Sequence, residues 1–286
     1  MAAPGLAAPG GGAMSPALLR LDKLTRRFGG LVAVNAVDLA VAAGTVHGLI
    51  GPNGAGKTTL FNLVSGHLRP NGGTITFGGA DATRWAPERR AVAGVRRTFQ
   101  NLRLFREMTA LGNVAVGLHA ETRCEVLDAL LRPPRQRREE AMVAERAREA
   151  LDFVGLLPMA GLVAGSLPYG HQRLLEIARA IAGRPKLLLL DEPAAGLNNN
   201  EAGRLVELIG RIKATGTAVL LVEHHMQVVM RTCGAITVLN HGSRLAEGSP
   251  ADIRAHPEVI AAYLGKGSLA ARSGPAGARP AAQAAC

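Results

Sequence analysis

The chain is 286 residues long, with a formal net charge of +11 and 48% hydrophobic residues, many of them alanine. This length suits one large domain or a domain with a subdomain. No uninterrupted apolar stretch approaches the roughly 20 residues that a membrane-spanning helix needs, so we expect no such helix. The three cysteines are widely spaced and match neither a disulfide framework nor a metal-ligand pattern, which indicates a reducing cytosol.

The positive charge raises the question of a nucleic-acid partner. Aromatic residues make up only 3% of the chain, and the sequence contains no recognised nucleic-acid module, so we expect no such partner. Basic segments are also attracted to anionic membrane surfaces within a Debye length, and this accounts for the same charge. The basic stretch at 132–138 is predicted to be a solvated loop, with contact to lipid headgroups or a membrane protein as the alternative.

The N-terminal third is predicted to be rich in strands. Residues 1–16 are mostly Ala, Gly and Pro and are predicted to be a disordered tail. Short alternating segments punctuated by Gly or Asn then predict strands at Leu18–Leu24, Val37–Val41 and Thr74–Phe77. Val46–Ile50 predicts a further strand, which is followed by glycines and by a helix from Lys57.

The middle of the chain changes to a helical pattern. Glu and Arg lie among Ala, Val and Leu at helical spacing, which predicts a helical subdomain from about residue 102 to 165. A further helix is predicted from Tyr169 to Ala182, and buried strands at Lys186–Leu190 and Thr217–Val222. Alternating strands and helices predict an α/β fold with a mostly parallel sheet. Residues 266–286 return to the composition of the first tail and are predicted to be disordered.

One segment satisfies the phosphate-binding pattern G-x-x-x-x-G-K-[ST] in full. It consists of Gly51, Pro52, Asn53, Gly54, Ala55, Gly56, Lys57 and Thr58, and Thr59 follows it. The glycines let backbone N–H groups surround phosphate oxygens, Lys57 reaches the β- and γ-phosphates, and Thr58 is suited to ligate Mg²⁺. The alternative is a chance Gly-rich turn, which the apolar strand before it and the helix after it disfavour.

Two carboxylates, Asp191 and Glu192, follow the apolar run Leu187–Leu190. The carboxyl ends of strands are where ligands bind in open α/β sheets. We expect Asp191 to hold the Mg²⁺ shell and Glu192 to polarise the water that attacks the γ-phosphate. A turn or helix-cap signal is the alternative for an Asp-Glu pair alone, and the phosphate-binding segment favours the catalytic interpretation.

The chain resembles the ATPases of ATP-binding-cassette (ABC) transporters. Their signature loop is matched by Leu167, Pro168, Tyr169, Gly170 and His171, shortly before Asp191. Further motifs resemble the family's Q-loop glutamine, its switch histidine, its adenine-stacking aromatic and its D-loop: Gln100, His224, Phe28 and Ala195–Asn198. The resemblance implies that Gln100 ligates Mg²⁺ and that His224 contacts the γ-phosphate. It covers 17–265 and implies a P-loop NTPase cassette with an N-terminal antiparallel β-subdomain and an inserted helical subdomain.

A finer resemblance is to the ATP-binding subunits of branched-chain amino acid importers. It rests on four segments, Phe28–Val34, Arg97–Thr109, Glu192–Asn198 and Tyr263–Gly265. Importers of amides or urea share much of this pattern and are the alternative. The cargo is an analogy in either case, because the ATPase subunit does not touch it.

The chain departs from the wider family at two places. Pro168-Tyr169 stands where Ser-Gly is usual, which removes a hydroxyl and a backbone N–H that would face the second subunit's nucleotide. Pro168 remains compatible with a helix start, since the first turn has spare N–H groups. His225 replaces the acid that commonly follows the switch histidine.

The resemblance implies an assembly on the cytoplasmic face of the cell membrane. Two ATPase subunits, identical or related, would sandwich ATP and Mg²⁺ between one phosphate-binding segment and the other's signature loop. The pair would drive transmembrane permease subunits and, indirectly, a substrate-binding protein. Three rivals are a soluble cassette ATPase acting on nucleic acid, a small-molecule kinase and a scaffold module. The signature loop argues against the kinase, and Lys57, Asp191 and Glu192 argue against the scaffold.

Overall fold

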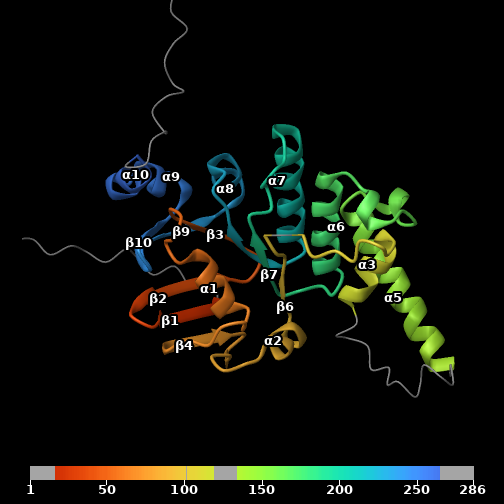
Figure 1. Cartoon of the computed structure of the whole chain (residues 1–286), viewed down its shortest axis with the longest axis horizontal. Helices are drawn as coiled ribbons and strands as arrows, with labels where there is room; N and C mark the ends of the chain where they lie inside the picture. The colour runs from red at the N-terminus through yellow and green to blue at the C-terminus, as the bar shows by residue number, and fades with distance from the viewer. Residues whose placement is uncertain (1–16, 101, 119–133, 265–286) are drawn as a thin grey trace, which may run out of the picture.

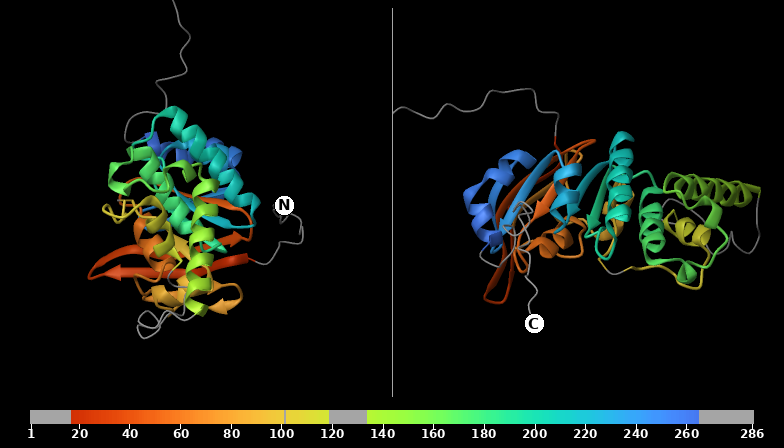
Figure 2. Two further views of the ribbon diagram at one scale, coloured as in Figure 1. Left: turned by 90° about the vertical axis from the view of Figure 1, so that its right-hand side faces the viewer. Right: turned by 90° about the horizontal axis from the view of Figure 1, so that it is seen from above.

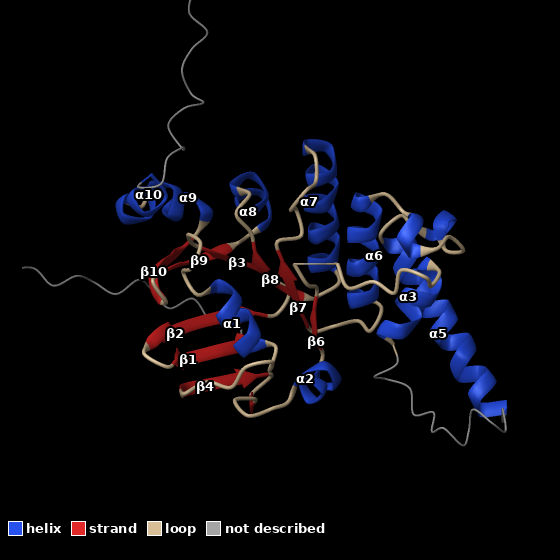
Figure 3. Cartoon of the chain, in the orientation of Figure 1, coloured by secondary structure: helices blue, strands red, loops and turns tan. Residues whose placement is uncertain are grey.

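The computed structural model describes residues 17–100, 102–118 and 134–264. The predicted tails at 1–16 and 266–286, and Gly265 of the importer-like ending, lie outside these ranges. The described residues form two β-sheets and the helices that surround them (Figure 1, Figure 3).

The first sheet is antiparallel, with strand order β2-β1-β4-β5. Its strands are β1 (Ala17–Phe28), β2 (Leu31–Ala42), β4 (Gly72–Phe77) and β5 (Ala80–Asp81). Buried leucine and valine alternate with more exposed residues along β1 and β2, so one face of each strand is buried. The predicted antiparallel β-subdomain is confirmed, although β1 and β2 are longer than the sequence segments that predicted them, because they continue into a tight turn at Gly29 (φ 56°).

The second sheet has the order β10-β9-β3-β8-β7-β6, and all its neighbouring strands are parallel except β10, which is antiparallel to β9. Its strands are β3 (Val46–Ile50), β6 (Val95–Arg97), β7 (Leu187–Asp191), β8 (Ala218–Val222), β9 (Ala235–Asn240) and β10 (Ser243–Gly248). Every residue of β3, β7 and β8 is buried, as expected for parallel strands covered on both faces. The prediction of a mostly parallel core sheet is confirmed.

Successive leucines of β7 enter two different cores. Leu187 and Leu189 pack in the cluster that contains α1 and the antiparallel sheet, whereas Leu188 and Leu190 pack in the cluster of the remaining helices. This alternation follows from the two-residue period of a strand. The helices flanking the sheet are α1 (Lys57–Val64), α2 (Pro87–Ala93), α7 (Asn199–Ala214), α8 (Met226–Thr232), α9 (Pro250–Ala255) and α10 (Pro257–Leu264).

The remaining helices form a separate group beyond the β6 edge of the sheet (Figure 2). They are α3 (Ala110–Gly117), α5 (Pro134–Phe153), the short helices η2 (Leu157–Met159) and η3 (Ala164–Ser166), and α6 (Tyr169–Ile181). Helix α6 packs against α3 and α5, so this group extends past residue 165, where the sequence prediction ended it. The loop prediction for 132–138 is wrong from Pro134 onward, because this part begins α5. Residues 132 and 133 lie outside the described ranges.

Helix α1 is held at its C-terminal end by Arg90. The guanidinium of Arg90 is buried and donates hydrogen bonds to the carbonyls of Leu63, Val64, Ala82 and Trp85. A cation at the last carbonyls of a helix also complements the negative end of its dipole. Burial lowers the pKa of Arg90 to about 10, which leaves it charged at neutral pH.

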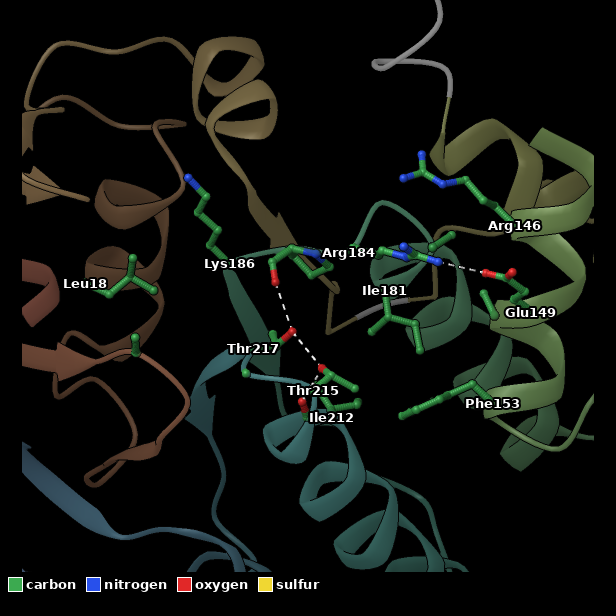
Figure 4. Close-up of a pocket in the computed structure, with 15 residues that line it drawn as sticks. Leu18, Arg146, Glu149, Phe153, Ile181, Arg184, Lys186, Ile212, Thr215 and Thr217 are labelled. Atoms are coloured by element: carbon green, nitrogen blue, oxygen red, sulfur yellow. Dashed lines mark hydrogen bonds and ion pairs between the residues drawn. The ribbon is translucent and has the colours of Figure 1, made fainter. Parts of the chain in front are cut away.

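A cavity of about 570 Å³ separates the helical group from the start of β7 (Figure 4). Phe153, Ile181 and Ile212 supply apolar walls, and an exposed ion pair between Arg184 and Glu149 lies at its rim. The cavity therefore opens at the amino ends of the parallel strands, whereas Asp191 ends β7 at the opposite edge. No helix in the described ranges has the length and apolar character needed to span a bilayer.

Candidate active site

The phosphate-binding segment joins β3 to α1, as the sequence predicted. A Cβ on Gly51 would lie 2.3 Å from the carbonyl oxygen of Leu239, and one on Gly56 would lie 2.4 Å from that of Ala33. Both positions also have positive φ, 153° and 98°. Only glycine fits there, because a side chain would collide with the neighbouring backbone. No side chain caps α1, and its first turn carries no acidic residue. Its N-terminal N–H groups thus face an anion site of the kind that binds phosphate.

Lys57 begins α1 and turns its ammonium group back over the loop. The ammonium donates to the carbonyl of Gly51 at 2.7 Å and to that of Pro52 at 3.0 Å. Burial lowers the pKa of Lys57 from its usual value, while the negative charges of Glu192 and Asp191 act in the opposite direction. The two carboxylates therefore lie close enough to Lys57 to stabilise its positive charge.

Glu192 is contacted by two other predicted site residues. Its backbone has φ 48°, an unusual conformation for a residue with a side chain, and its N–H donates to the carbonyl of Val222 at 2.9 Å. Its carboxylate accepts a hydrogen bond from the Gln100 amide at 3.2 Å, and its Oε2 lies 3.7 Å from Nδ1 of His224. The structure therefore brings Gln100, Glu192 and His224 together from three separate loops.

Asp191 forms an ion pair that the sequence analysis did not predict. Arg97 Nη2 donates to Asp191 Oδ2 at 2.9 Å, and Nη1 donates to Asn62 and to Ser65. Arg97 ends β6, and β6 is the neighbour of β7. Its proximity to Asp191 depends on this strand order, so no local sequence pattern indicates it.

The backbone before and at Gln100 is fastened to α6. Arg173 donates to the carbonyls of Phe99 and Gln100 at 2.9 and 2.8 Å, and Glu176 accepts from the N–H of Phe99 at 3.1 Å. Arg173 and Glu176 also form a buried ion pair at 3.2 Å. Burial raises the pKa of Glu176, although the N–H of Phe99 and the charge of Arg173 oppose this shift. The helix that carries the signature loop thus also positions Gln100.

The signature loop lies beside the D-loop segment of the same chain. Leu167 is buried, Pro168 is the N-cap of α6 in an extended conformation, and Tyr169 is 46% exposed. A Cβ on Gly170 would lie 2.6 Å from Glu201 Oε1, and one on Gly196 would lie 3.0 Å from the Tyr169 ring. These close approaches join the signature loop to the start of α7.

The signature loop is linked to the cluster around Glu192 through Arg173, whose Nη2 donates to the Tyr169 hydroxyl at 3.2 Å and to the carbonyl of Gln100 at 2.8 Å. Helix α6 lies beyond the β6 edge of the sheet, away from α1, in Figures 1 and 2. Phe28 ends β1 at the β1–β2 turn, where it is 43% exposed and has the Arg26 guanidinium 4.6 Å from its ring centroid. His225 is the N-cap residue of α8. Within one chain, the predicted residues therefore form a cluster at the strand ends, a signature loop at the start of α6 and an exposed aromatic at the β1–β2 turn.

Comparison with known proteins agrees with this fold. Residues 34–195 match the ABC transporter family, and the chain belongs to that family. It is an ATPase subunit of the cassette class and binds nucleotide. A crystal structure of a nucleotide-free ATP-binding cassette from an ABC transporter is 31% identical, with a TM-score of 0.77, and covers 87% of this chain and 100% of that one. The ADP conformation of such a cassette gives the same identity and TM-score and covers 88% of this chain and 100% of that one.

Two further findings concern the subgroup. Residues 243–268 match a family described as branched-chain amino acid ATP-binding cassette transporter. The high-affinity branched-chain amino acid transport ATP-binding protein BraF of Pseudomonas aeruginosa is 46% identical over 254 residues, which covers 88% of this chain and 100% of BraF. The protein of the same description from Escherichia coli K12, LivG, is 45% identical with the same coverage. The resemblance inferred from the sequence is confirmed.

Proposed function

We propose that this chain powers import of branched-chain amino acids by hydrolysing ATP between two cassette subunits. The observation that carries the hydrolytic role is the convergence of Gln100 and His224 on Glu192 beside the phosphate-binding segment. Support for the cargo comes from the relatives, which are branched-chain amino acid transport proteins. An importer of an amide or urea-type substrate is the alternative cargo.

Glu192 is assigned the role of general base. Its carboxylate accepts the proton of the attacking water, and the hydrogen bond from Gln100 fixes its orientation. His224 and Lys57 stabilise charge on the transferring phosphoryl group, since catalysis of phosphoryl transfer is mainly positioning and electrostatics.

Magnesium is the metal that the site residues fit. Thr58, Gln100 and Asp191 offer a hydroxyl, an amide oxygen and a carboxylate, which are the hard oxygen donors that Mg²⁺ prefers. Asp191 lies at the end of β7 with a carboxylate that Arg97 orients. When bound, the ion would neutralise charge on the β- and γ-phosphates. We assign Phe28 to adenine stacking, and the segment from Gly51 to Thr59 to the phosphates.

The exposed signature loop is assigned to the nucleotide of a second cassette subunit. Tyr169 is exposed and begins α6, whose first N–H groups have no side-chain cap. We place the pair on the inner face of the cell membrane, bound to permease subunits and served indirectly by a substrate-binding protein.

Substitution of Glu192 tests the hydrolytic role. Glu192→Gln should retain ATP binding, lose most phosphate release and trap the ATP-bound dimer, since the amide accepts no proton from water. Glu207→Gln, an exposed glutamate of α7, is the matched control and should turn over like wild type. Wild-type turnover in Glu192→Gln would show that Glu192 is not the general base.

The cargo needs a separate experiment. The chain is co-purified with its permease from membranes and reconstituted in vesicles with the substrate-binding protein. Leucine, isoleucine or valine should stimulate ATP hydrolysis, whereas urea and short amides should not. Stimulation by urea or amides alone would replace the branched-chain assignment.

A further inference from the structure

A buried carboxylate next to the switch histidine belongs to neither the predicted site nor the catalytic roles above. Glu223 follows β8 directly and precedes His224, and only 1% of its surface is exposed. Its Oε1 accepts a hydrogen bond from the N–H of Ala194 at 2.6 Å. Its Oε2 accepts from the N–H groups of His224 at 3.1 Å and His225 at 3.2 Å. One carboxylate therefore joins two loops.

The two loops belong to different parts of the site. Strands β7 and β8 are neighbours, with Asp191 paired to Val222, so the segments that follow them leave the sheet side by side. The segment after β7 carries Glu192 and continues to Ala194 and the D-loop. The segment after β8 carries His224.

The chemistry of Glu223 suits this position. An ionised carboxylate offers acceptors on both oxygens, and its hydrogen bonds to backbone N–H groups are charge-assisted. Buried N–H groups need an acceptor, so the arrangement of both loops depends on the same side chain. A hydroxyl or amide at this position would lack acceptors on two separate atoms.

We propose that Glu223 is a positioning residue for ATP hydrolysis, which holds the D-loop and the switch histidine in one fixed relationship. Through the N–H of Ala194 it fixes the segment that leads from Glu192, and through the N–H of His224 it fixes the imidazole that lies 3.7 Å from Glu192. A displacement of the D-loop by the second subunit is then transmitted to His224. This inference rests on the proposed hydrolytic function.

The test is the isosteric change Glu223→Gln in the full-length chain. The amide keeps one acceptor and directs its NH₂ group at backbone N–H groups of one loop, so one of the two attachments is lost. We expect kcat for phosphate release to fall about tenfold, and KM for Mg-ATP to stay within about twofold, because the phosphate-binding segment is untouched. Glu223→Asp keeps both acceptor oxygens and should recover part of the lost kcat.

A matched control separates positioning from general stability. Asn113 in α3 is also fully buried and bonds the backbone at Phe105, Met108 and Thr109. Asn113→Asp should lower Tm while the folded protein keeps the wild-type kcat. Equal kcat in Glu223→Gln and wild type, a proportional change of kcat and KM, or failure of both Glu223 variants to fold would each overturn the proposal.

The same measurement on Glu192→Gln distinguishes failure of the positioning role of Glu223 from failure of the hydrolytic role of Glu192. Lost turnover in Glu192→Gln with wild-type kcat in Glu223→Gln would overturn only the positioning role. Wild-type turnover in Glu192→Gln would overturn the hydrolytic assignment of Glu192, whatever the result at Glu223.

Discussion

Arg97 and Asp191 form a buried ion pair in which Nη2 and Oδ2 are 2.9 Å apart, with side-chain exposures of only 9% and 5%. Two ions this far from water are costly to separate, because the one that remains keeps its desolvation penalty without its partner. The pair also couples β6, which leads into Gln100, to the carboxylate that we assign to Mg²⁺.

Arg97→Ala should therefore destabilise the protein strongly. We expect the free energy of unfolding to fall by about 3 kcal/mol, measured by urea denaturation without nucleotide. Arg184→Ala removes an ion pair at 3.2 Å whose partners are 71% and 56% exposed, and should cost under about 1 kcal/mol. Asp191→Asn added to Arg97→Ala should recover part of the loss, since it removes the uncompensated charge. Equal effects of the two arginine substitutions would contradict the distinction by burial.

Lys57→Ala should weaken nucleotide binding itself. A charged hydrogen-bond donor to phosphate contributes about 1.5–3 kcal/mol, so the affinity for ATP should fall roughly ten- to a hundredfold. Titration calorimetry with Mg-ATP measures this loss. Lys186→Ala, which changes a lysine at the cavity near the opposite end of β7, is the control and should bind ATP like wild type. Unchanged affinity in Lys57→Ala would remove Lys57 from the phosphate site.

His47 should make the protein less stable in acid. Burial lowers its pKa from 6.5 to about 4, and Nε2 lies 2.8 Å from Thr237 Oγ1. Between these pH values the unfolded chain binds a proton that the folded chain does not, so stability falls as the pH is lowered from 6.5 to 4. The difference between these two pKa values corresponds to a loss of roughly 3 kcal/mol in the free energy of unfolding when the pH falls below both.

The measurement is the pH dependence of urea unfolding for two substitutions. His47→Gln, which preserves a partner for Thr237, should flatten the dependence between pH 6.5 and 4, although its stability at neutral pH will be lower. The exposed His241 has φ 45°, which asparagine tolerates, so His241→Asn is the control and should keep the wild-type slope. An unchanged slope in His47→Gln would show that its burial does not control acid stability.

Gly196→Ala should disturb the contact between the D-loop and the signature loop. Gly196 has φ 77°, and an added Cβ would lie 3.0 Å from the Tyr169 ring, so we expect a loss of about 1–3 kcal/mol in the free energy of unfolding. Gly210 in α7 has open space around an added Cβ. Gly210→Ala should instead stabilise the helix by about 0.5–1 kcal/mol. Thermal unfolding of both variants tests this, and a stabilised Gly196→Ala would contradict the close packing.

Sequence patterns predicted the helices and strands whose start and end are marked by neighbouring residues in the chain. The strand Val46–Ile50 and the helix start at Lys57 have the predicted bounds, because an apolar run, glycines and a helical pattern follow one another directly. Helix α6 begins at Tyr169 as predicted and ends one residue early, at Ile181. The helical subdomain boundary could not be set this way, because α6 joins that group by packing across the chain against α3 and α5.

Two residues that sequence reasoning missed reach their partners because of the order of the strands in the sheet. Arg97 reaches Asp191 because β6 and β7 are neighbours, and Glu223 reaches Ala194 because β7 and β8 are neighbours. A single Arg at the end of a short strand, or a Glu before a His, does not indicate such a contact. Gln100 and His224 were found by their resemblance to family motifs, and only the structure places them on the same carboxylate.

Helix α1 is fixed at its C-terminal end as well as at the phosphate-binding segment. Arg90 holds the carbonyls of Leu63 and Val64, while Lys57 and the glycine loop define the other end. The helix is thereby preorganised: the conformational entropy of placing its N–H groups is lost during folding and not when the nucleotide arrives. Nucleotide affinity should consequently depend on Arg90, which never approaches a phosphate.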